Sequence, residues 1–252
     1  MRLSNRCFAV TGLCYLPPFS VNAGFVTGDE TTLIIDTGAN AAAAATIHGY
    51  ATTARPSNGL LVLDTERHFD HIGGNGYFHA RGVDVYGHAS IQRTDEEFRL
   101  EMAEFKQGVS SPARRSNQDA QVFYHGTRLA NPNCPITGEF CMDLGGCPIE
   151  VLLTPGHTPS NISVYVPSDG ALYCGDCLVN GYLPNLDAGS VDDWRVWLKS
   201  LDRIAALAPR IVVAGHGPVA IGDEVPRVLE RVREILQQSI ETGRSPTSLA
   251  DS

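Results

Sequence analysis

The chain has 252 residues and a formal net charge of −9 at pH 7, with 43% of its residues apolar and 19% charged. This length and composition predict one packed globular domain and exclude a disordered or fibrous protein. The negative charge, with no run of lysine or arginine to offset it, argues against a nucleic-acid partner, and the apolar runs are too short to span a membrane.

The first part of the chain is predicted to form short strands around one helix. Apolar runs bounded by Pro-Pro and Gly-Asp turns indicate the strands, and an alanine-rich run after Gly38 indicates the helix. The predicted elements are strands 6–11, 23–26, 32–36 and 60–64 and a helix 39–50. An antiparallel opening therefore leads into a strand–helix–strand order.

The middle of the chain is predicted to hold a charged helix and a long loop. Residues 94–106 carry dense charge at helical spacing, with Phe98, Met102 and Phe105 on one apolar stripe. Residues 110–134 are rich in serine, asparagine, arginine and proline and show neither helical nor strand periodicity. Because long loops of this kind often cover active sites, this segment is the candidate lid.

Strands and helices alternate in the rest of the chain. The remaining predicted elements are strands 83–86, 149–153, 162–166, 171–174 and 211–214 and helices 192–208 and 224–241. The helix 192–208 is expected to be capped by Asp192 and to end before Pro209. The two halves repeat one order of elements, which favours a two-layer α/β arrangement over a solenoid.

No secretory signal is recognisable at the N-terminus, so a cytoplasmic location is expected. In that reducing environment the seven cysteines are expected to be free thiols. The residues interpreted as small buried hydrophobes are Cys7, Cys14 and Cys174. A second set lies in a loop-like region without the paired spacing of a zinc knuckle, and no metal site is predicted for it: Cys134, Cys141 and Cys147.

Candidate metal ligands are concentrated directly after the strand 60–64. The segment TERHFDHIGG places Glu66, His68, Asp70 and His71 within six residues. Strand-like alternation puts Glu66 and His68 on one side, and a turn at Asp70-His71 can offer a second pair to a neighbouring ion. One loop can thus serve two adjacent metal sites.

Three more candidate ligands follow later strands. His157 stands in TPGHTP, Asp176 in CGD and His216 in AGHGP. Each is near Gly or Pro, as expected where the backbone turns sharply to aim a side chain. Each alone is also compatible with an ordinary turn, but their order and strand context together predict a metal site.

This ordered set resembles the metallo-β-lactamase superfamily, whose signature is H-x-H-x-D-H followed by His, Asp and His. The resemblance covers nearly the whole chain and includes LIIDTG at 33–38, where Asp36 would support the metal ligands. It implies an α/β fold, the four-layer αββα sandwich with two mixed sheets face to face and helices outside. It also implies a single domain over residues 1–252, in which a helix-loop lid insertion spans about 89–146.

The resemblance implies two divalent metal ions. The first would be held by Glu66, His68 and His157, the second by Asp70, His71 and His216, with Asp176 bridging. The sequence departs from the family pattern at Glu66, where the first His is usual. A third carboxylate suits manganese and iron better than imidazole does, although zinc accepts carboxylates. Zinc is the expected metal, with iron and manganese as alternatives.

The resemblance implies metal-assisted hydrolysis, like that of the glyoxalase-II-like and lactamase-like members. Two metals would lower the pKa of a bridging water to about 7 and supply hydroxide to attack an ester, thioester, lactone or lactam carbonyl of a small molecule. Asp70 would orient the hydroxide and accept its proton, as the catalytic residue. The leaving group would be protonated by metal-bound water, Tyr124 or His125. A glutathione thioester is less favoured, because the chain ends soon after His216 without an added helical domain.

Two other function classes stay open. Iron-dependent redox chemistry of the flavodiiron or persulfide-dioxygenase type would use the three carboxylates, although the flavodiiron pattern has its Glu at the second position and no flavodoxin module follows. A non-catalytic binding protein would have Glu66 as the mark of a decayed first metal site. The nuclease branch is least favoured, because the chain is acidic.

Overall fold

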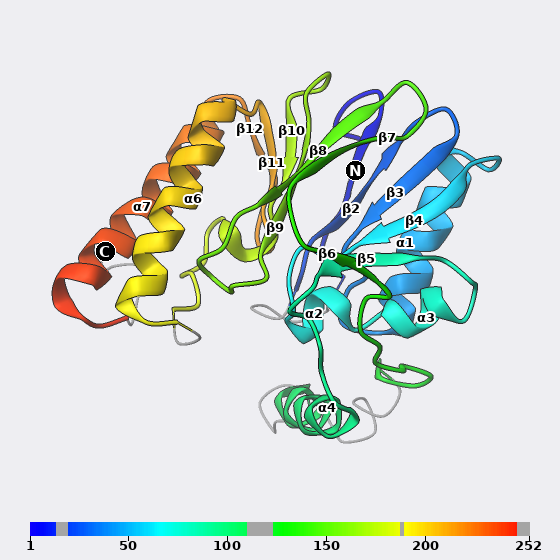
Figure 1. Cartoon of the computed structure of the whole chain (residues 1–252), viewed down its shortest axis with the longest axis horizontal. Coiled ribbons are helices and arrows are strands. Elements are labelled where there is room, and N and C mark those ends of the chain that lie inside the picture. Colours follow the sequence, from blue (N-terminus) through cyan, green and yellow to red (C-terminus); the bar gives the residue numbers. More distant parts are fainter. Residues whose placement is uncertain (14–19, 110–122, 187–188, 246–252) are drawn as a thin grey trace.

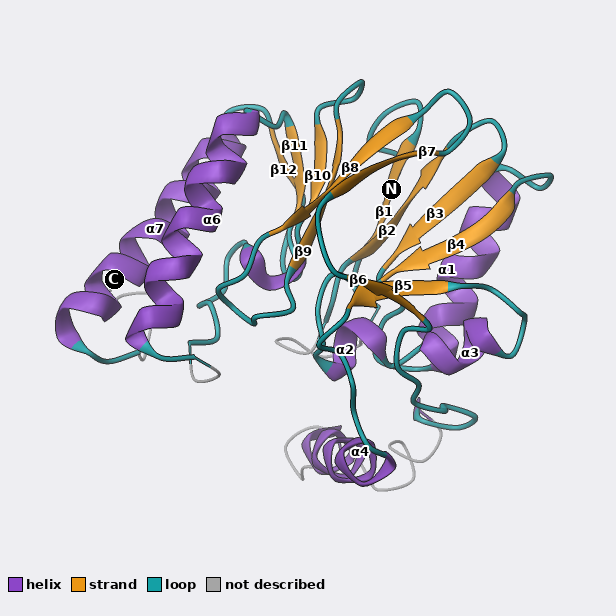
Figure 2. Cartoon of the chain, viewed as in Figure 1, coloured by secondary structure: helices purple, strands orange, loops and turns teal. Residues whose placement is uncertain are grey.

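The computed structural model describes residues 1–13, 20–109, 123–186 and 189–245. Two six-stranded sheets pack against each other, with helices on their outer faces (Figures 1 and 2). The first sheet contains, in spatial order, β1 (Cys7–Val10), β2 (Ala23–Thr27), β3 (Thr31–Ile35), β4 (Gly59–Leu63), β5 (Val85–His88) and β6 (Cys134–Ile136). The second contains β12 (Ala220–Ile221), β11 (Ile211–Val213), β10 (Ala171–Tyr173), β9 (Ile162–Val166), β8 (Pro148–Leu153) and β7 (Phe140–Asp143).

The helices flank these sheets and link their strands. They are α1 (Ala41–Ala54), α2 (Phe69–Ile72), α3 (Asn75–His79), α4 (Asp95–Val109), α6 (Val191–Leu207) and α7 (Glu224–Thr242), with a 3-10 turn η1 (Gly175–Cys177). In Figure 1, α6 and α7 lie outside the second sheet and α1 and α3 outside the first. None of the described helices is both long and apolar enough to cross a membrane.

The alternation of side chains along the strands explains the layers. In β3, Leu33 and Ile35 belong to the core between the two sheets, whereas Ile34 belongs to the core beneath α1. In β10, Tyr173 faces the other sheet and Leu172 faces α6 and α7. Both sheets are therefore buried on both faces, and the predicted four-layer αββα sandwich is confirmed. The two-layer arrangement favoured by the order of elements alone is wrong, because that order does not reveal that two sheets stack.

Strand direction brings the carboxyl ends of distant strands to one edge. In the first sheet, β4 runs parallel to β3 and β5. In the second, β11 is parallel to β10, and β9 is antiparallel to both β8 and β10, so β8, β10 and β11 run in one direction. Loops that leave β4, β8, β10 and β11 can therefore converge, as in other open α/β sheets.

The N-terminal cap of α6 differs from the predicted one. Helix α6 is capped by Ser190, whose hydroxyl accepts a hydrogen bond from the amide of Asp193, while the Asp193 carboxylate accepts one from the Ser190 amide. Asp192 lies inside the first turn and is not the cap. The two reciprocal hydrogen bonds between Ser190 and Asp193 form a capping box, which makes Ser190 the N-cap residue of the helix.

The predicted lid insertion extends too far. Residues 134–136 and 140–143 form β6 and β7, which are the edge strands of the two sheets. Cys134 and Cys141 therefore lie on strands, and Cys147 lies in the turn that follows β7. These strands are short and gain order from their sheet neighbours, which local periodicity does not reveal. Most of the predicted loop, residues 110–122, and Cys14 lie outside the described residues.

The loop after β8 passes very close to α6 at Gly156. Its φ is 152°, and a Cβ there would lie 2.3 Å from the Cβ of Trp197 and 2.5 Å from its Cα. Because the backbone of α6 cannot yield, Gly156→Ala is expected to lower the free energy of unfolding by about 2–4 kcal/mol. Urea denaturation measures this change.

Gly49→Ala is the matched control, because a Cβ at Gly49 in α1 meets nothing within 4 Å. That substitution should leave stability unchanged or raise it by up to about 1 kcal/mol. Equal unfolding free energies for the Gly156 variant and the wild type would contradict the close packing.

Candidate metal centre

The predicted ligands follow the carboxyl ends of four strands. Glu66 and His68 come after β4, His157 after β8, Asp176 after β10 and His216 after β11. The structure brings them together with Asp70 and His71 of α2, and their ligand atoms form overlapping groups that span less than 4.8 Å. These groups are Glu66–His68–His157, Asp70–His71–His216 and Glu66–His71–Asp176. All the ligands predicted from the sequence thus converge.

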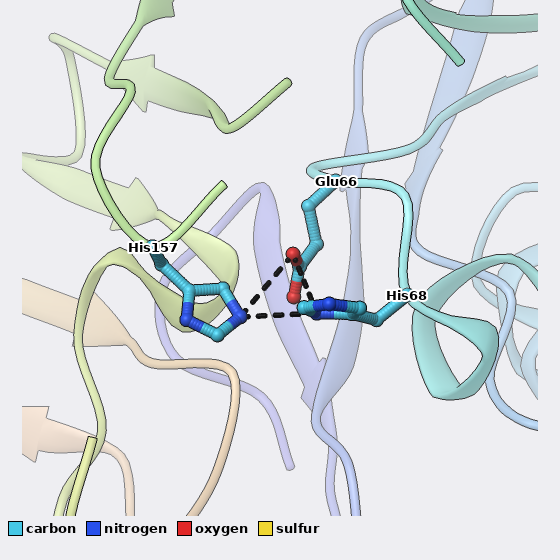
Figure 3. A group of neighbouring side chains, drawn as sticks. All are labelled: Glu66, His68 and His157. Atoms are coloured by element: carbon cyan, nitrogen blue, oxygen red, sulfur yellow. Dashed lines mark hydrogen bonds and ion pairs between the residues drawn. The ribbon is translucent and has the colours of Figure 1, made fainter. Parts of the chain in front are cut away.

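The first group faces inward from two separate loops (Figure 3). Glu66 Oε2 lies 3.0 Å from His68 Nδ1 and 3.4 Å from His157 Nε2. The two imidazoles meet at 3.0 Å between His157 Nε2 and His68 Nδ1. A carboxylate oxygen and two ring nitrogens therefore surround one small space.

The short helix α2 supplies the second group. Phe69 and Ile72 of α2 pack into apolar clusters with neighbouring segments, so Asp70 and His71 are held between two anchored positions. His216 Nε2 completes the group at 3.3 Å from Asp70 Oδ2. Apolar side chains at both ends of one helical turn thus fix the two ligands between them.

Asp176 lies between the groups. Its Oδ1 is 3.3 Å from His71 Nε2, and its Oδ2 is 3.3 Å from His216 Nε2 and 3.6 Å from His157 Nε2. Only glycine fits at position 215, since a Cβ there would lie 1.8 Å from the side-chain Oδ1 of Asp176 and 2.9 Å from its backbone nitrogen. This geometry fits the predicted bridging position.

The outer nitrogens of three imidazoles are held by oxygen atoms. His71 Nδ1 lies 2.9 Å from Asp36 Oδ2, His157 Nδ1 3.1 Å from the carbonyl of Asn185, and His216 Nδ1 2.7 Å from the carbonyl of Ser20. Because each outer nitrogen donates its proton to an acceptor, the neutral ring presents a lone pair from Nε2 to the centre. The expected support by Asp36 agrees with this geometry, whereas no side-chain pattern pointed to Ser20 or Asn185.

Burial and opposite charges shift the titration of these groups. Burial opposes the charged form of His157, but the Glu66 and Asp176 carboxylates outweigh it and raise its pKa to about 9. The same balance, with Asp176 and Asp70, raises the pKa of His216 to about 11. Burial opposes ionisation of Glu66, but the charges of His68, His157 and His71 lower its pKa below the ordinary value. In the metal-free chain the carboxylates are therefore ionised and these two histidines hold protons at neutral pH.

Several inward-facing atoms make no hydrogen bond within the described part of the chain. They are both carboxylate oxygens of Glu66, Nε2 of His71 and Oδ1 of Asp176. Glu66 and His71 are fully buried. Leaving such polar atoms unsatisfied costs about 1–3 kcal/mol each, more for charged groups, unless a ligand meets them. Divalent cations fit this set, because its donors are imidazole nitrogens and carboxylate oxygens at the spacing of shared ligands.

The contact between Asp36 and His71 leads to a prediction. Asp36 also accepts hydrogen bonds from the amide and hydroxyl of Thr65, so its carboxylate links the β4 loop to the candidate ligand His71. Asp36→Asn should present an amide donor to Nδ1 and disturb the ring's tautomer, lowering metal affinity by about 10–100-fold. Competition with a chelating dye measures the affinity. Asp29→Asn, at an exposed turn, is the control, and equal affinities for both variants would refute the support role.

Comparison with known proteins assigns the chain to a family. The model of the metallo-beta-lactamase superfamily matches residues 16–216. A metallo-beta-lactamase type 2 of Bacteroides fragilis is 25% identical over 250 residues, covering 97% of this chain and 88% of that protein. A hydroxyacylglutathione hydrolase of Dechloromonas aromatica is 33% identical over 94 residues, which cover 37% of this chain and 34% of that protein.

A solved structure shows the same fold. A metallo-beta-lactamase from Pontibacter korlensis superposes with a TM-score of 0.67 at 19% identity, over 94% of this chain and 97% of that one. The sheet order, the converging ligands and a family match across most of the sequence agree with one another. The chain therefore belongs to the metallo-beta-lactamase superfamily.

Proposed function

We propose that the chain is a metal-dependent hydrolase that cleaves an ester, thioester, lactone or lactam bond in a small molecule. The observation that carries the proposal is the convergence of carboxylate oxygens and imidazole nitrogens, among which four buried atoms make no hydrogen bond to the described residues: both oxygens of Glu66, Oδ1 of Asp176 and Nε2 of His71. Membership in the superfamily supports hydrolysis, as do the names of a lactamase and a hydroxyacylglutathione hydrolase among its relatives. We propose that these residues bind two divalent ions, with zinc as the first choice of metal.

When bound, such ions would supply a hydroxide nucleophile near neutral pH and polarise the scissile carbonyl. The side chains divide the remaining work. Asp70, which lies 3.3 Å from His216 Nε2 in the second group, would orient the nucleophile and accept its proton. Asp36, together with the carbonyls of Asn185 and Ser20, holds imidazole rings in the orientation that keeps Nε2 directed at the centre.

The leaving group needs a proton donor, and the two side chains named for this from the sequence differ in position. Tyr124 is buried, with its ring 5.8 Å from that of Phe69 in α2. His125 is exposed. We propose water at the centre as the proton source, with Tyr124 and His125 as the alternatives. A lid role for residues near 110–134, a cytoplasmic location and the absence of a nucleic-acid partner remain predictions.

Metal analysis of purified protein, paired with turnover of a panel of lactams, lactones, esters and thioesters, tests the proposal. We expect about two metal ions per chain, and hydrolysis that a chelator abolishes and the added metal restores. Protein that contains no metal, or hydrolysis that resists chelation, would refute it.

The three carboxylates keep an iron-dependent redox enzyme as the second candidate, because oxygen ligands suit iron. The same preparation separates the two functions. Iron in the purified protein together with oxygen consumption would favour redox chemistry, whereas zinc with acyl turnover favours hydrolysis.

A further inference from the structure

The two oxygens of Glu66 face different ligand groups. Oε2 lies 3.0 Å from His68 Nδ1 and 3.4 Å from His157 Nε2, which belong to the first group. Oε1 lies 3.2 Å from His71 Nε2, which belongs to the second. The side chain is fully buried, and within the described residues neither oxygen accepts a hydrogen bond.

We infer that Glu66 bridges the two metal positions, so that the centre has two shared carboxylates, Glu66 and Asp176. This inference rests on the proposed metal centre, and it changes the assignment of Glu66 to the first ion alone. Asp176 also contacts both groups, with Oδ1 towards His71 of the second group and Oδ2 towards His157 of the first and His216 of the second. The two carboxylates therefore share two imidazoles, His71 and His157, and each directs one oxygen towards His71.

The chemistry of the side chain explains why glutamate differs from the histidine usual at this position. A carboxylate carries two equivalent oxygens at one end, and each can bind a different ion. A neutral imidazole has only one acceptor nitrogen, so it serves one ion. A second bridging carboxylate also adds negative charge between the ions and presents hard oxygen donors, which favour manganese or iron relative to an imidazole-rich set.

If Glu66 is shared, its substitution should weaken the binding of both metal ions, whereas substitution of a ligand of one ion should weaken the binding of that ion alone. The comparison is between Glu66→Gln and His68→Gln, because His68 contacts only Glu66 and His157 among the ligands. Metal-free wild type and both variants are titrated with Zn²⁺ and with Mn²⁺ against a competing chelator dye. We expect Glu66→Gln to weaken both metal equivalents by at least about tenfold, and His68→Gln to weaken only one. Glu150→Gln on β8 is the control for loss of a carboxylate outside the centre.

A variant of Glu66→His tests the inference independently, should the glutamine variant fold poorly by circular dichroism. Imidazole at this position should restore one equivalent, leave the other weakened, and shift the ratio of Zn²⁺ to Mn²⁺ affinity at least about tenfold towards zinc. The bridge is overturned by a Glu66→Gln variant that keeps one equivalent at wild-type affinity, as His68→Gln should, or by a Glu66→His variant that binds both equivalents at wild-type affinity. Failure of the wild type itself to take up metal would instead overturn the proposed function.

Discussion

Replacement of Asp176 with asparagine is expected to lower kcat/KM for the acyl substrate by about 10³-fold or more. Asparagine keeps the shape of the side chain but removes a negative charge that faces His71, His157 and His216. Because one oxygen becomes an amide nitrogen, which does not bind cations, the side chain can no longer join the two groups. Steady-state kinetics and metal content of the same sample measure the effect.

Asp202→Asn is the matched control for this substitution. Asp202 lies on α6 with 64% of its side chain exposed and pairs with Arg233, so that variant loses a carboxylate and an ion pair away from the centre. Its kcat/KM should stay within about twofold of the wild type, as for most surface substitutions. An Asp176→Asn enzyme that keeps both metal ions and activity within tenfold of the wild type would rule out a bridging role.

Metal affinity is expected to rise by up to about 100-fold per pH unit between pH 7 and 9. In the metal-free protein, nearby carboxylates outweigh burial and raise the pKa of His157 to about 9 and that of His216 to about 11. Both rings must lose a proton before Nε2 can bind a cation, and each proton released contributes about tenfold per pH unit. Above pH 9 only His216 should still contribute. Calorimetric titration in buffers of different ionisation enthalpy counts the protons.

The same shifts predict the opposite trend for the stability of the metal-free fold. A histidine whose pKa is higher in the folded state than in the unfolded state stabilises the fold fully below the unfolded pKa of about 6.5. That contribution is lost as the pH rises through about 9 for His157 and about 11 for His216. Metal-free protein should therefore melt at a lower temperature at pH 9 than at pH 6.5. If metal binding released no protons, or if the melting temperature rose from pH 6.5 to pH 9, His157 and His216 would not be protonated beside carboxylates in the metal-free protein.

Much of the framework follows from local sequence. Strands such as β2, β3, β4 and β9 were predicted within one or two residues, because apolar runs bounded by turn residues depend only on neighbours in the chain. The candidate ligands could be predicted for a similar reason. Each follows a strand end in a turn rich in Gly or Pro, and TERHFDHIGG crowds several donors into one loop.

Short strands that gain their order from a paired strand were missed. Strand β6 pairs with β5, which lies far away in the sequence and which no local window contains. Strands β7 and β12 pair with the neighbouring strands β8 and β11, but with two to four residues they are too short to show a strand pattern. The stacking of two separate sheets was likewise indicated only by the family resemblance. An order of strands and helices is compatible with one sheet or with two.

The sequence by itself determined which residues could bind metal, in what order they occur and at which strand ends they stand. Only the tertiary structure decided that Glu66 faces both ligand groups and that the carbonyls of Ser20 and Asn185 hold two of the imidazoles. The reason is physical: a local pattern specifies the strand before each ligand, whereas ligand distances depend on how loops from two sheets meet at one edge. A main-chain carbonyl, moreover, is present at every residue, so its role leaves no mark in the sequence.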